Sequence, residues 1–207
     1  TLYLQEELDN WSRVATADGY SGYIKKEVLS DPKDDNEEHA STVPEYTNIS
    51  KDYKINLAFH QVTSMDGNAT LAQMVADAQG VNTISPTWFG TISSLASADY
   101  VNQAHAMGME VWGLIDNFNS ETDNLTFLSS TAARANIIQQ LMTQAASVGL
   151  DGINLDFESI TEEQAPHYIQ FVRELSIACR NQGIVFSIDD PVPTYSKHYD
   201  RTEQGIV

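Results

Sequence analysis

The stretch from Ile55 onward alternates short apolar runs with longer stretches of helical spacing. Strands that are joined by helices pair in parallel through right-handed crossovers. This order predicts an α/β fold, either a doubly wound sheet or a (β/α) barrel, and the pattern alone leaves both open. The five expected strands are INLAFHQV (55–62), VNTISPTWF (81–89), MEVWGLIDN (109–117), DGINLDFE (151–158) and IVFSIDD (184–190).

Three stretches have the spacing of amphipathic helices, with apolar residues at i, i+3 and i+4 and a glycine at the end. In the last of them, Pro166 favours a helix that begins later than Thr161. Cys179 lies on the apolar face of the same helix, so we expect a packed core thiol and not a nucleophile. The predicted helices cover residues 68–80, 130–149 and 161–183, and Ser130 or Thr131 can cap the second.

Residues 1–30 have a different texture from the rest of the chain. Short apolar and polar alternations are broken there at DG and SG, which predicts two or three small antiparallel strands. Residues 31–52 are rich in charge, Ser and Pro and have no periodicity, which indicates a linker. We therefore expect a small β segment at 1–30, a linker at 31–52 and the main domain at 53–207.

The charge of the chain narrows the classes of partner. Acidic residues outnumber basic ones 29 to 11, which gives a net charge of −18. Such a charge repels nucleic-acid phosphates and anionic lipid surfaces, so we expect neither nucleic acid nor a membrane as partner. A single cysteine excludes an intramolecular disulfide and is compatible with export. The chain starts at Thr1 without a leader, and we expect the signal segment to lie outside it.

Carboxylates interrupt the apolar run GLDGINLDFESI (149–160). Successive strand residues point to opposite faces, so Asn154, Asp156 and Glu158 share the face that is not apolar. Glu158 falls at the carboxyl end, where parallel α/β folds of both kinds hold their active sites. Asp156 and Glu158 lie about 7 Å apart along the strand, so one carboxyl should keep its proton to higher pH, ready to protonate a leaving group.

Asp151 precedes the strand at the opposite parity. The sequence leaves open whether it joins the site or only caps a neighbouring element. A divalent metal site is the weaker alternative, because both acids come from one strand and no second cluster of acids or histidines clearly joins them. We expect no metal and no cofactor.

The run DGINLDFE resembles the D-x-x-D-x-D-x-E signature of glycoside hydrolase family 18, the chitinase-like enzymes. INLAFHQV is similar to the first strand of that family. SIDDPVPTYSKHYDR (187–201) is similar to the fifth-strand region of a bacterial branch associated with spore and cell-wall peptidoglycan. The resemblance covers residues 53–207, and the signature positions fall on Asp151, Asn154, Asp156 and Glu158.

Residues 1–30 resemble the C-terminal part of a bacterial SH3-like wall-binding module. The alternative is a packed hairpin of the main domain. If the resemblance holds, these residues attach the protein to the bacterial cell wall, and we expect an extracellular location at the wall or the spore. The residues that carry this resemblance are Trp11, the turn Asp18–Gly19–Tyr20 and Gly22–Tyr23.

The family resemblance implies a retaining glycosidase in which the 2-acetamido oxygen of the substrate is the nucleophile. By position, Glu158 is the general acid and then the base for water. Asp156 orients the acetamido N–H and stabilises the oxazolinium-like charge. Asn154 replaces the Asp usual in the family, and we expect it to bond Asp156 and to change the pH optimum. The substrate class is an N-acetylglucosamine polysaccharide, with peptidoglycan favoured over chitin.

Further candidate substrate-binding residues lie at the other strand ends. Trp88 can stack on a sugar ring or pack in the core. His60 is expected to be a satisfied core histidine, with a site role as the alternative. The remaining candidates, as ligands or helix caps, are Asp116, Asn117, Asp189 and Asp190.

The resemblance also implies a (β/α)8 TIM barrel, of which only about the first five βα units are present. A closed barrel needs eight strands and typically about 250 residues. We therefore expect a fragment with an open sheet edge and with reduced or no activity of its own. Two alternatives remain: a glycan-binding protein without catalysis on the same scaffold, and an unrelated metal-dependent or phosphate-handling α/β enzyme. The second lacks support because no Gly-rich phosphate loop follows any expected strand.

Overall fold

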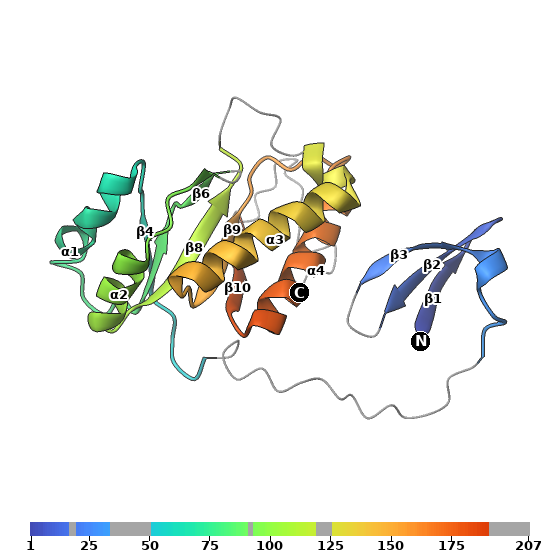
Figure 1. The fold of residues 1–207 in the computed structure, drawn as a ribbon, viewed down its shortest axis with the longest axis horizontal. Coiled ribbons are helices and arrows are strands. Elements are labelled where there is room, and N and C mark those ends of the chain that lie inside the picture. The colour runs from blue at the N-terminus through green and yellow to red at the C-terminus, as the bar shows by residue number, and fades with distance from the viewer. Residues whose placement is uncertain (17–19, 34–50, 91–92, 119–125, 191–207) are drawn as a thin grey trace, which may run out of the picture. The chain divides into compact units, whose positions relative to one another are not determined.

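The computed structural model describes residues 1–16, 20–33, 51–90, 93–118 and 126–190 (Figure 1). The chain forms two units, Thr1–Glu45 and Tyr46–Val207. The first holds a small antiparallel sheet and the second holds a parallel sheet with its helices. Within the described residues, no helix has the length and apolar content that a membrane span requires.

The N-terminal unit is a three-stranded antiparallel sheet in the order β1-β2-β3. This confirms the predicted small strands and is consistent with the SH3-like resemblance, while the turn residues Asp18 and Gly19 lie outside the described residues. Ser12 and Val14 are buried on one face, and Trp11 and Tyr23 are exposed. The elements are β1 (Leu2–Glu7), β2 (Trp11–Thr16), β3 (Ser21–Lys25) and the 3-10 helix η1 (Lys26–Val28).

Five parallel strands form the main path of the larger sheet, in the order β10-β9-β8-β5-β4. Each strand therefore neighbours the one that precedes it in this series, and the order never reverses. A doubly wound sheet contains a point where the strand order reverses, whereas a barrel winds in one direction. The five predicted strands are confirmed as β4 (Leu57–His60), β5 (Thr83–Pro86), β8 (Glu110–Asp116), β9 (Gly152–Asp156) and β10 (Val185–Ile188).

A short irregular extension continues the path of β5. The strands β6 (Phe89–Gly90) and β7 (Ser93–Ser94) pair with each other in an antiparallel arrangement. β6 also pairs in parallel with the end of β8, where Gly90 lies opposite Asp116. β5 therefore pairs with the first residues of β8, and β6 pairs with its last residues.

Two long helices pack together along one face of the sheet, α3 (Thr131–Val148) and α4 (Ala165–Gln182) (Figure 1). The hydroxyl of Ser130 accepts a hydrogen bond from the backbone N–H of Ala133 and caps α3, as predicted. Pro166 stands in the first turn of α4, so that helix begins after Thr161, also as predicted. Cys179 is fully buried, and burial raises the pKa of its thiol to about 12.

The predicted helix at 68–80 is wrong in extent. The segment contains the end of the 3-10 helix η2 (Met65–Thr70) and a single α-turn, α1 (Leu71–Met74). The side chain of Asn68 donates to the carbonyl of Leu95 and accepts from the indole of Trp88, so contacts distant in sequence shape this segment. The elements that were not predicted include α2 (Ala98–Ala106), capped by Ser97, and the 3-10 helix η3 (Thr126–Ser129).

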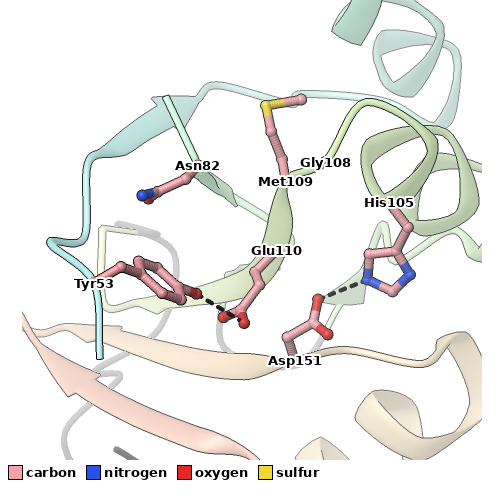
Figure 2. A pocket seen from close by; sticks show the side chains of 7 residues that line it. All are labelled: Tyr53, Asn82, His105, Gly108, Met109, Glu110 and Asp151. Carbon is pink, nitrogen blue, oxygen red and sulfur yellow. Dashed lines mark hydrogen bonds and ion pairs between the residues drawn. The ribbon is translucent and has the colours of Figure 1, made fainter. Parts of the chain in front are cut away.

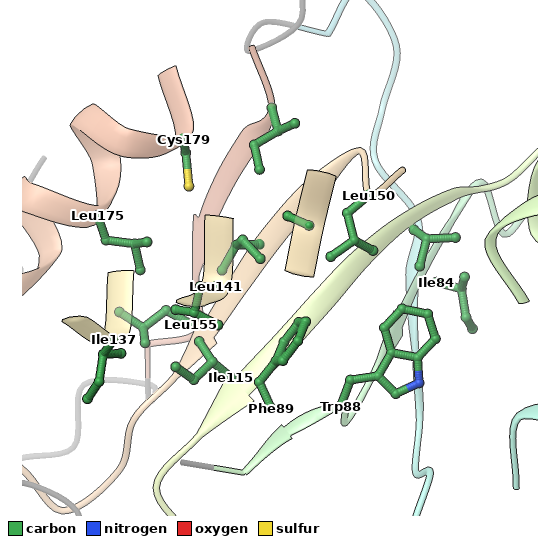
Figure 3. Close-up of a cluster of buried hydrophobic side chains, with 14 of the residues drawn as sticks. Ile84, Trp88, Phe89, Ile115, Ile137, Leu141, Leu150, Leu155, Leu175 and Cys179 are labelled. Carbon is green, nitrogen blue, oxygen red and sulfur yellow. The ribbon is translucent and has the colours of Figure 1, made fainter. Parts of the chain in front are cut away.

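The core lies between the sheet and the helices (Figure 3). From β9, the side chains of Ile153 and Leu155 are fully buried in it, and Phe157 beyond the strand stacks on Phe171 of α4. Close packing also requires Gly152, because a Cβ there would lie 3.0 Å from the carbonyl oxygen of Val185. The apolar face of β9 thus meets the helices, and its other face is left for polar residues.

Candidate active site

Two acids of the signature, Asp156 and Glu158, lie at the carboxyl end of β9. Asp156 is the last residue of β9, and Glu158 follows two residues later. Asn154 is 1% exposed, Asp156 is half-buried and Glu158 is exposed. The structure therefore shows the predicted division of this strand into an apolar and a polar face.

A second acid from the neighbouring strand joins them. In the parallel register of β8 and β9, Asp116 lies opposite Asp156. Because adjacent strands lie about 4.8 Å apart and paired residues point to the same face, these two side chains are neighbours. Burial raises the pKa of Asp116, although a hydrogen bond from the N–H of Phe118 partly opposes that effect. Because its pKa is raised, the carboxyl of Asp116 holds its proton to higher pH than an exposed Asp does, directly beside Asp156.

Asn154 connects β9 to β10. Its Nδ2 donates to Oδ2 of Asp189 at 2.8 Å, and its Oδ1 accepts from the hydroxyl of Ser187 at 2.6 Å. The amide was expected to bond Asp156, and the structure instead gives it partners on the next strand. Burial raises the pKa of Asp189, the hydrogen bond from Asn154 lowers it, and the charge of Asp190 raises it.

Asn117 contacts the backbone of the predicted general acid. Its Nδ2 donates to the carbonyl oxygen of Glu158 at 2.8 Å, and its Oδ1 accepts from the N–H of Glu158 at 2.9 Å. The sequence placed Asn117 at the mouth as a ligand or a cap. The structure places it there but directs its amide at Glu158.

A pocket of about 480 Å³ opens at the carboxyl ends of β4, β5 and β8. Gln61, Thr87, Gly90, Asp116 and Phe118 are among the residues that line it. The ring of Phe118 is 53% exposed, and the sequence reasoning missed it. Its signal was available, since it follows Asp116 and Asn117 directly beyond a strand end.

Trp88 packs in the core and also lines the pocket at the carboxyl ends of the strands, so its contact with a sugar stays a prediction. Its side chain is fully buried, and its indole donates to Oδ1 of Asn68 at 2.8 Å. It also packs edge-on against Tyr100, with ring centroids 5.0 Å apart. Trp88 therefore has the packing of a core residue in the wall of this pocket.

His60 is a buried core histidine with both ring nitrogens hydrogen-bonded. The hydroxyl of Thr70 donates to the carbonyl of Gly67, so it accepts from Nε2–H of His60 at 3.0 Å. Nδ1 then accepts from the hydroxyl of Tyr100 at 2.8 Å. Burial lowers the pKa of His60, which favours this neutral ring. These contacts are those of the satisfied core histidine that the sequence predicted, and a site role of His60 stays untested by them.

Asp151 lies at the amino edge of the sheet and is not brought together with the other acids. Its Oδ2 accepts from the N–H of Val111 at 2.8 Å and lies 2.7 Å from Nε2 of His105. Seven residues separate it from Glu158 along the strand direction, a span of about 23 Å at 3.3 Å per residue. Asp151 therefore stabilises the opposite end of the sheet.

The surroundings of Asp151 form a second pocket, of about 500 Å³ (Figure 2). Glu110 in its wall accepts from the ammonium of Lys51 at 2.6 Å, from the hydroxyl of Tyr53 and from the indole of Trp112. These contacts lower the pKa of Glu110 against the effect of burial. The three donors, on Lys51, Tyr53 and Trp112, are thus paired with an acceptor inside the protein, which is typical of a structural network. Across the described ranges, no group of three or more His, Cys, Asp and Glu side chains is placed to hold a metal ion.

No family model matches the chain, and no curated protein does. Solved structures match its fold. The chain is 18% identical to the Bacillus cereus spore cortex-lytic enzyme SleL, with a TM-score of 0.55 over 65% of this chain and 34% of that one. It is 18% identical to a class V chitinase from Pseudomonas fluorescens, with a TM-score of 0.54 over 66% and 44%.

A third match is a GH18 chitinase from Cycas revoluta, solved in complex with (GlcNAc)4. It is 14% identical, with a TM-score of 0.53 over 65% of this chain and 45% of that one. The fold is that of the family 18 chitinases. The chain spans less than half the length of each of these three structures. The expected (β/α) architecture is thereby confirmed.

Proposed function

We propose that the protein hydrolyses β-linked N-acetylglucosamine polymers with retention of configuration, and that the substrate supplies the nucleophile. The observation that carries this proposal is the placement of Asp156 and Glu158 at the carboxyl end of one parallel strand. Glycosidases need an acid that can protonate a leaving oxygen and a second group that manages the developing positive charge. The fold that the chain shares with chitinases supports the same chemistry.

Glu158, exposed at the mouth, donates its proton to the glycosidic oxygen as the bond to the anomeric carbon breaks. The carbonyl oxygen of the 2-acetamido group forms a bond to that carbon and closes an oxazolinium ring. Asp156 accepts a hydrogen bond from the acetamido N–H and stabilises the positive charge. Glu158 then takes a proton from water. The water oxygen bonds to the anomeric carbon from the face that the leaving group left, and the oxazolinium ring opens with retention of configuration.

The pocket that is lined by Asp116, the register partner of Asp156, suits a sugar. Asp116 and Gln61 offer polar groups, and the exposed ring of Phe118 offers an apolar face for a pyranose. Peptidoglycan is the favoured polymer, because the N-terminal sheet resembles a wall-binding module. The protein then acts outside the cell, at the wall or the spore.

Reducing-end release from N-acetylglucosamine oligomers and purified peptidoglycan tests the proposal, using the full natural protein that contains this sequence. Glu158→Gln should lower the rate by about 10²- to 10⁴-fold, the usual contribution of a positioned acid. The matched control is Glu163→Gln, an exposed residue before α4, which should leave the rate within twofold of wild type. An unchanged rate in Glu158→Gln would show that the assignment is wrong.

Two further outcomes separate the alternatives. A thiazoline mimic of the oxazolinium ring should inhibit competitively, and a lack of inhibition would count against substrate assistance. Saturable binding of the oligomers without release of reducing ends would instead support a glycan-binding protein.

The N-terminal unit needs its own experiment. Trp11 and Tyr23 are exposed there, and the ammonium of Lys25 lies 5.9 Å from the ring centre of Trp11. Removing residues 1–30 should reduce retention on purified cell walls while the rate on soluble oligomers stays the same. Equal retention of the two forms would contradict a role in wall binding.

A further inference from the structure

The backbone ladder between β8 and β9 ends before it reaches Glu158. The last paired residues are Asp116 and Asp156. Glu158 stands two residues further along, is exposed, and lies outside both strands. The direction of its side chain therefore depends on contacts other than the sheet itself.

The side chain of Asn117 supplies such contacts. It binds both the N–H and the carbonyl oxygen of Glu158, at 2.9 and 2.8 Å. Two bonds to one residue restrain the rotation of the peptide groups on both sides of its Cα. The amide of Asn117 thus continues the ladder from β8 for one more residue.

The loop that carries Asn117 is itself held in place. Oδ1 of Asp116 accepts from the N–H of Phe118 at 3.2 Å, the pattern of an Asx turn. This turn bends the chain directly around Asn117. The buried carboxylate of Asp116 therefore helps to direct the neighbouring amide toward β9.

The residue after Glu158 has an unusual backbone. Ser159 has a φ of +57°, and it is the only residue other than glycine with a positive φ among those described. A side chain in this region is strained, and strain persists only where the surroundings enforce it. The two bonds from Asn117 anchor the peptide unit that leads into this turn.

We propose that Asn117 is a positioning residue for Glu158. It fixes the backbone from which the general acid reaches the glycosidic oxygen, and it touches neither substrate nor the reacting atoms. The inference rests on the proposed function of Glu158.

Only a primary amide makes both bonds. Alanine makes neither, and an ionised aspartate accepts from the N–H of Glu158 but cannot donate to its carbonyl oxygen. A misplacement of about 1 Å at a catalytic group can lower a rate by about 10²-fold. Asn117→Ala and Asn117→Asp should therefore reduce kcat by about 10- to 100-fold while KM changes less than about threefold. Asn102→Ala, on the exposed side of α2, is the matched control and should leave both constants unchanged.

A double variant distinguishes positioning from a general loss of structure. If Asn117 acts through Glu158, then Asn117→Ala should lower kcat by less than about threefold in a Glu158→Gln background, since the effects of residues that act as a unit are not additive. Melting temperatures identify a variant that fails to fold, and Asn117→Asp, which keeps one bond, then replaces Asn117→Ala.

Each result has one reading. Normal kcat in both Asn117 variants, with Glu158→Gln slowed by about 10²-fold or more, overturns the positioning role and leaves the proposed function standing. The same loss in the wild-type and Glu158→Gln backgrounds also overturns it. A full natural protein without activity on any of the polymers overturns the proposed function and the positioning role together.

Discussion

The side-chain amide of Asn154 donates a hydrogen bond of 2.8 Å to Oδ2 of Asp189, just beyond β10. An ionised acid at position 154 could not make this bond, because a carboxylate is only an acceptor. The amide that replaces the acid of the signature is therefore matched to an acid on the next strand. Ser187 completes the arrangement by donating to the carbonyl of the same amide.

This pairing predicts a pH-dependent loss of stability in Asn154→Asp. Burial already raises the pKa of Asp189, and losing the donor while gaining a neighbouring carboxyl raises it further. The folded variant then binds a proton that the unfolded chain has released, so its unfolding free energy falls relative to wild type as the pH rises above the ordinary Asp range. Urea titrations at about pH 4 and about pH 8 should show the larger deficit at the higher pH.

The control is the exchanged pair. Asn154→Asp combined with Asp189→Asn restores one amide and one acid, and most of the stability at the higher pH should return. Equal deficits at both pH values, or no recovery in the exchanged pair, would contradict the pairing.

Replacing Asp116 by its amide should change stability in the opposite direction. Burial raises the pKa of Asp116, so folding favours its protonated form, and the charged form becomes a burden on stability as the pH rises. The amide introduced by Asp116→Asn keeps an oxygen that can accept from the N–H of Phe118, and it removes the ionisation. This variant should therefore gain melting temperature over wild type at neutral pH and lose that gain in acid. Asp77→Asn, exposed beyond α1, is the matched control and should leave the melting temperature unchanged.

Much of the fold follows from sequence periodicity. All five strands were predicted, because buried parallel strands have a compact apolar signature, and the two faces of β9 follow from strand geometry. The barrel-like winding did not follow from the pattern alone, since it depends on which strands become neighbours. The strand order supplied that information.

Contacts between distant residues decide the positions that the sequence left open. The sequence left open whether Trp88 packs in the core or contacts a sugar, and its indole finds a buried acceptor on Asn68. Asp151 belongs to the acidic motif by spacing, yet its carboxylate caps Val111 at the opposite edge. Asn117 was expected as a ligand or a cap, and its amide binds the backbone of Glu158, just beyond the carboxyl end of β9 and 41 positions along the chain. Residue spacing along one strand carries no record of these partners.

A buried ion pair joins the two long helices, and removing only one of its partners should be strongly destabilising. Nε and Nη2 of Arg134 donate to the two carboxylate oxygens of Glu174 at 2.9 and 3.0 Å, and both side chains are nearly buried. Removing one partner leaves a charge without its counterion in a poorly hydrated space. Glu174→Gln should lower the unfolding free energy by about 3–5 kcal/mol, measured by urea denaturation.

Two further variants provide comparisons for that measurement. One removes an exposed charge, and the other replaces both buried charges with apolar side chains. Glu162→Gln, which is exposed, should change the unfolding free energy by less than about 0.5 kcal/mol. Arg134→Met with Glu174→Leu should recover most of the loss, because apolar groups of similar volume replace both charges. A loss below about 1 kcal/mol in Glu174→Gln would show that the pair contributes little.

Phe118 should contribute to binding and not to folding. Its ring is 53% exposed at the edge of the carboxyl-end pocket, so its removal buries no new polar group and opens no cavity. If a pyranose face gains as much on this ring as a second aromatic ring would, about 0.5–1.5 kcal/mol, Phe118→Ala should weaken binding of an N-acetylglucosamine oligomer by about 2- to 10-fold in calorimetry. The melting temperature should stay within about 2 °C of wild type. Met107→Ala, 40% exposed beyond α2, is the control and should not change the affinity. Unchanged oligomer affinity in Phe118→Ala would place the sugar elsewhere along the carboxyl edge.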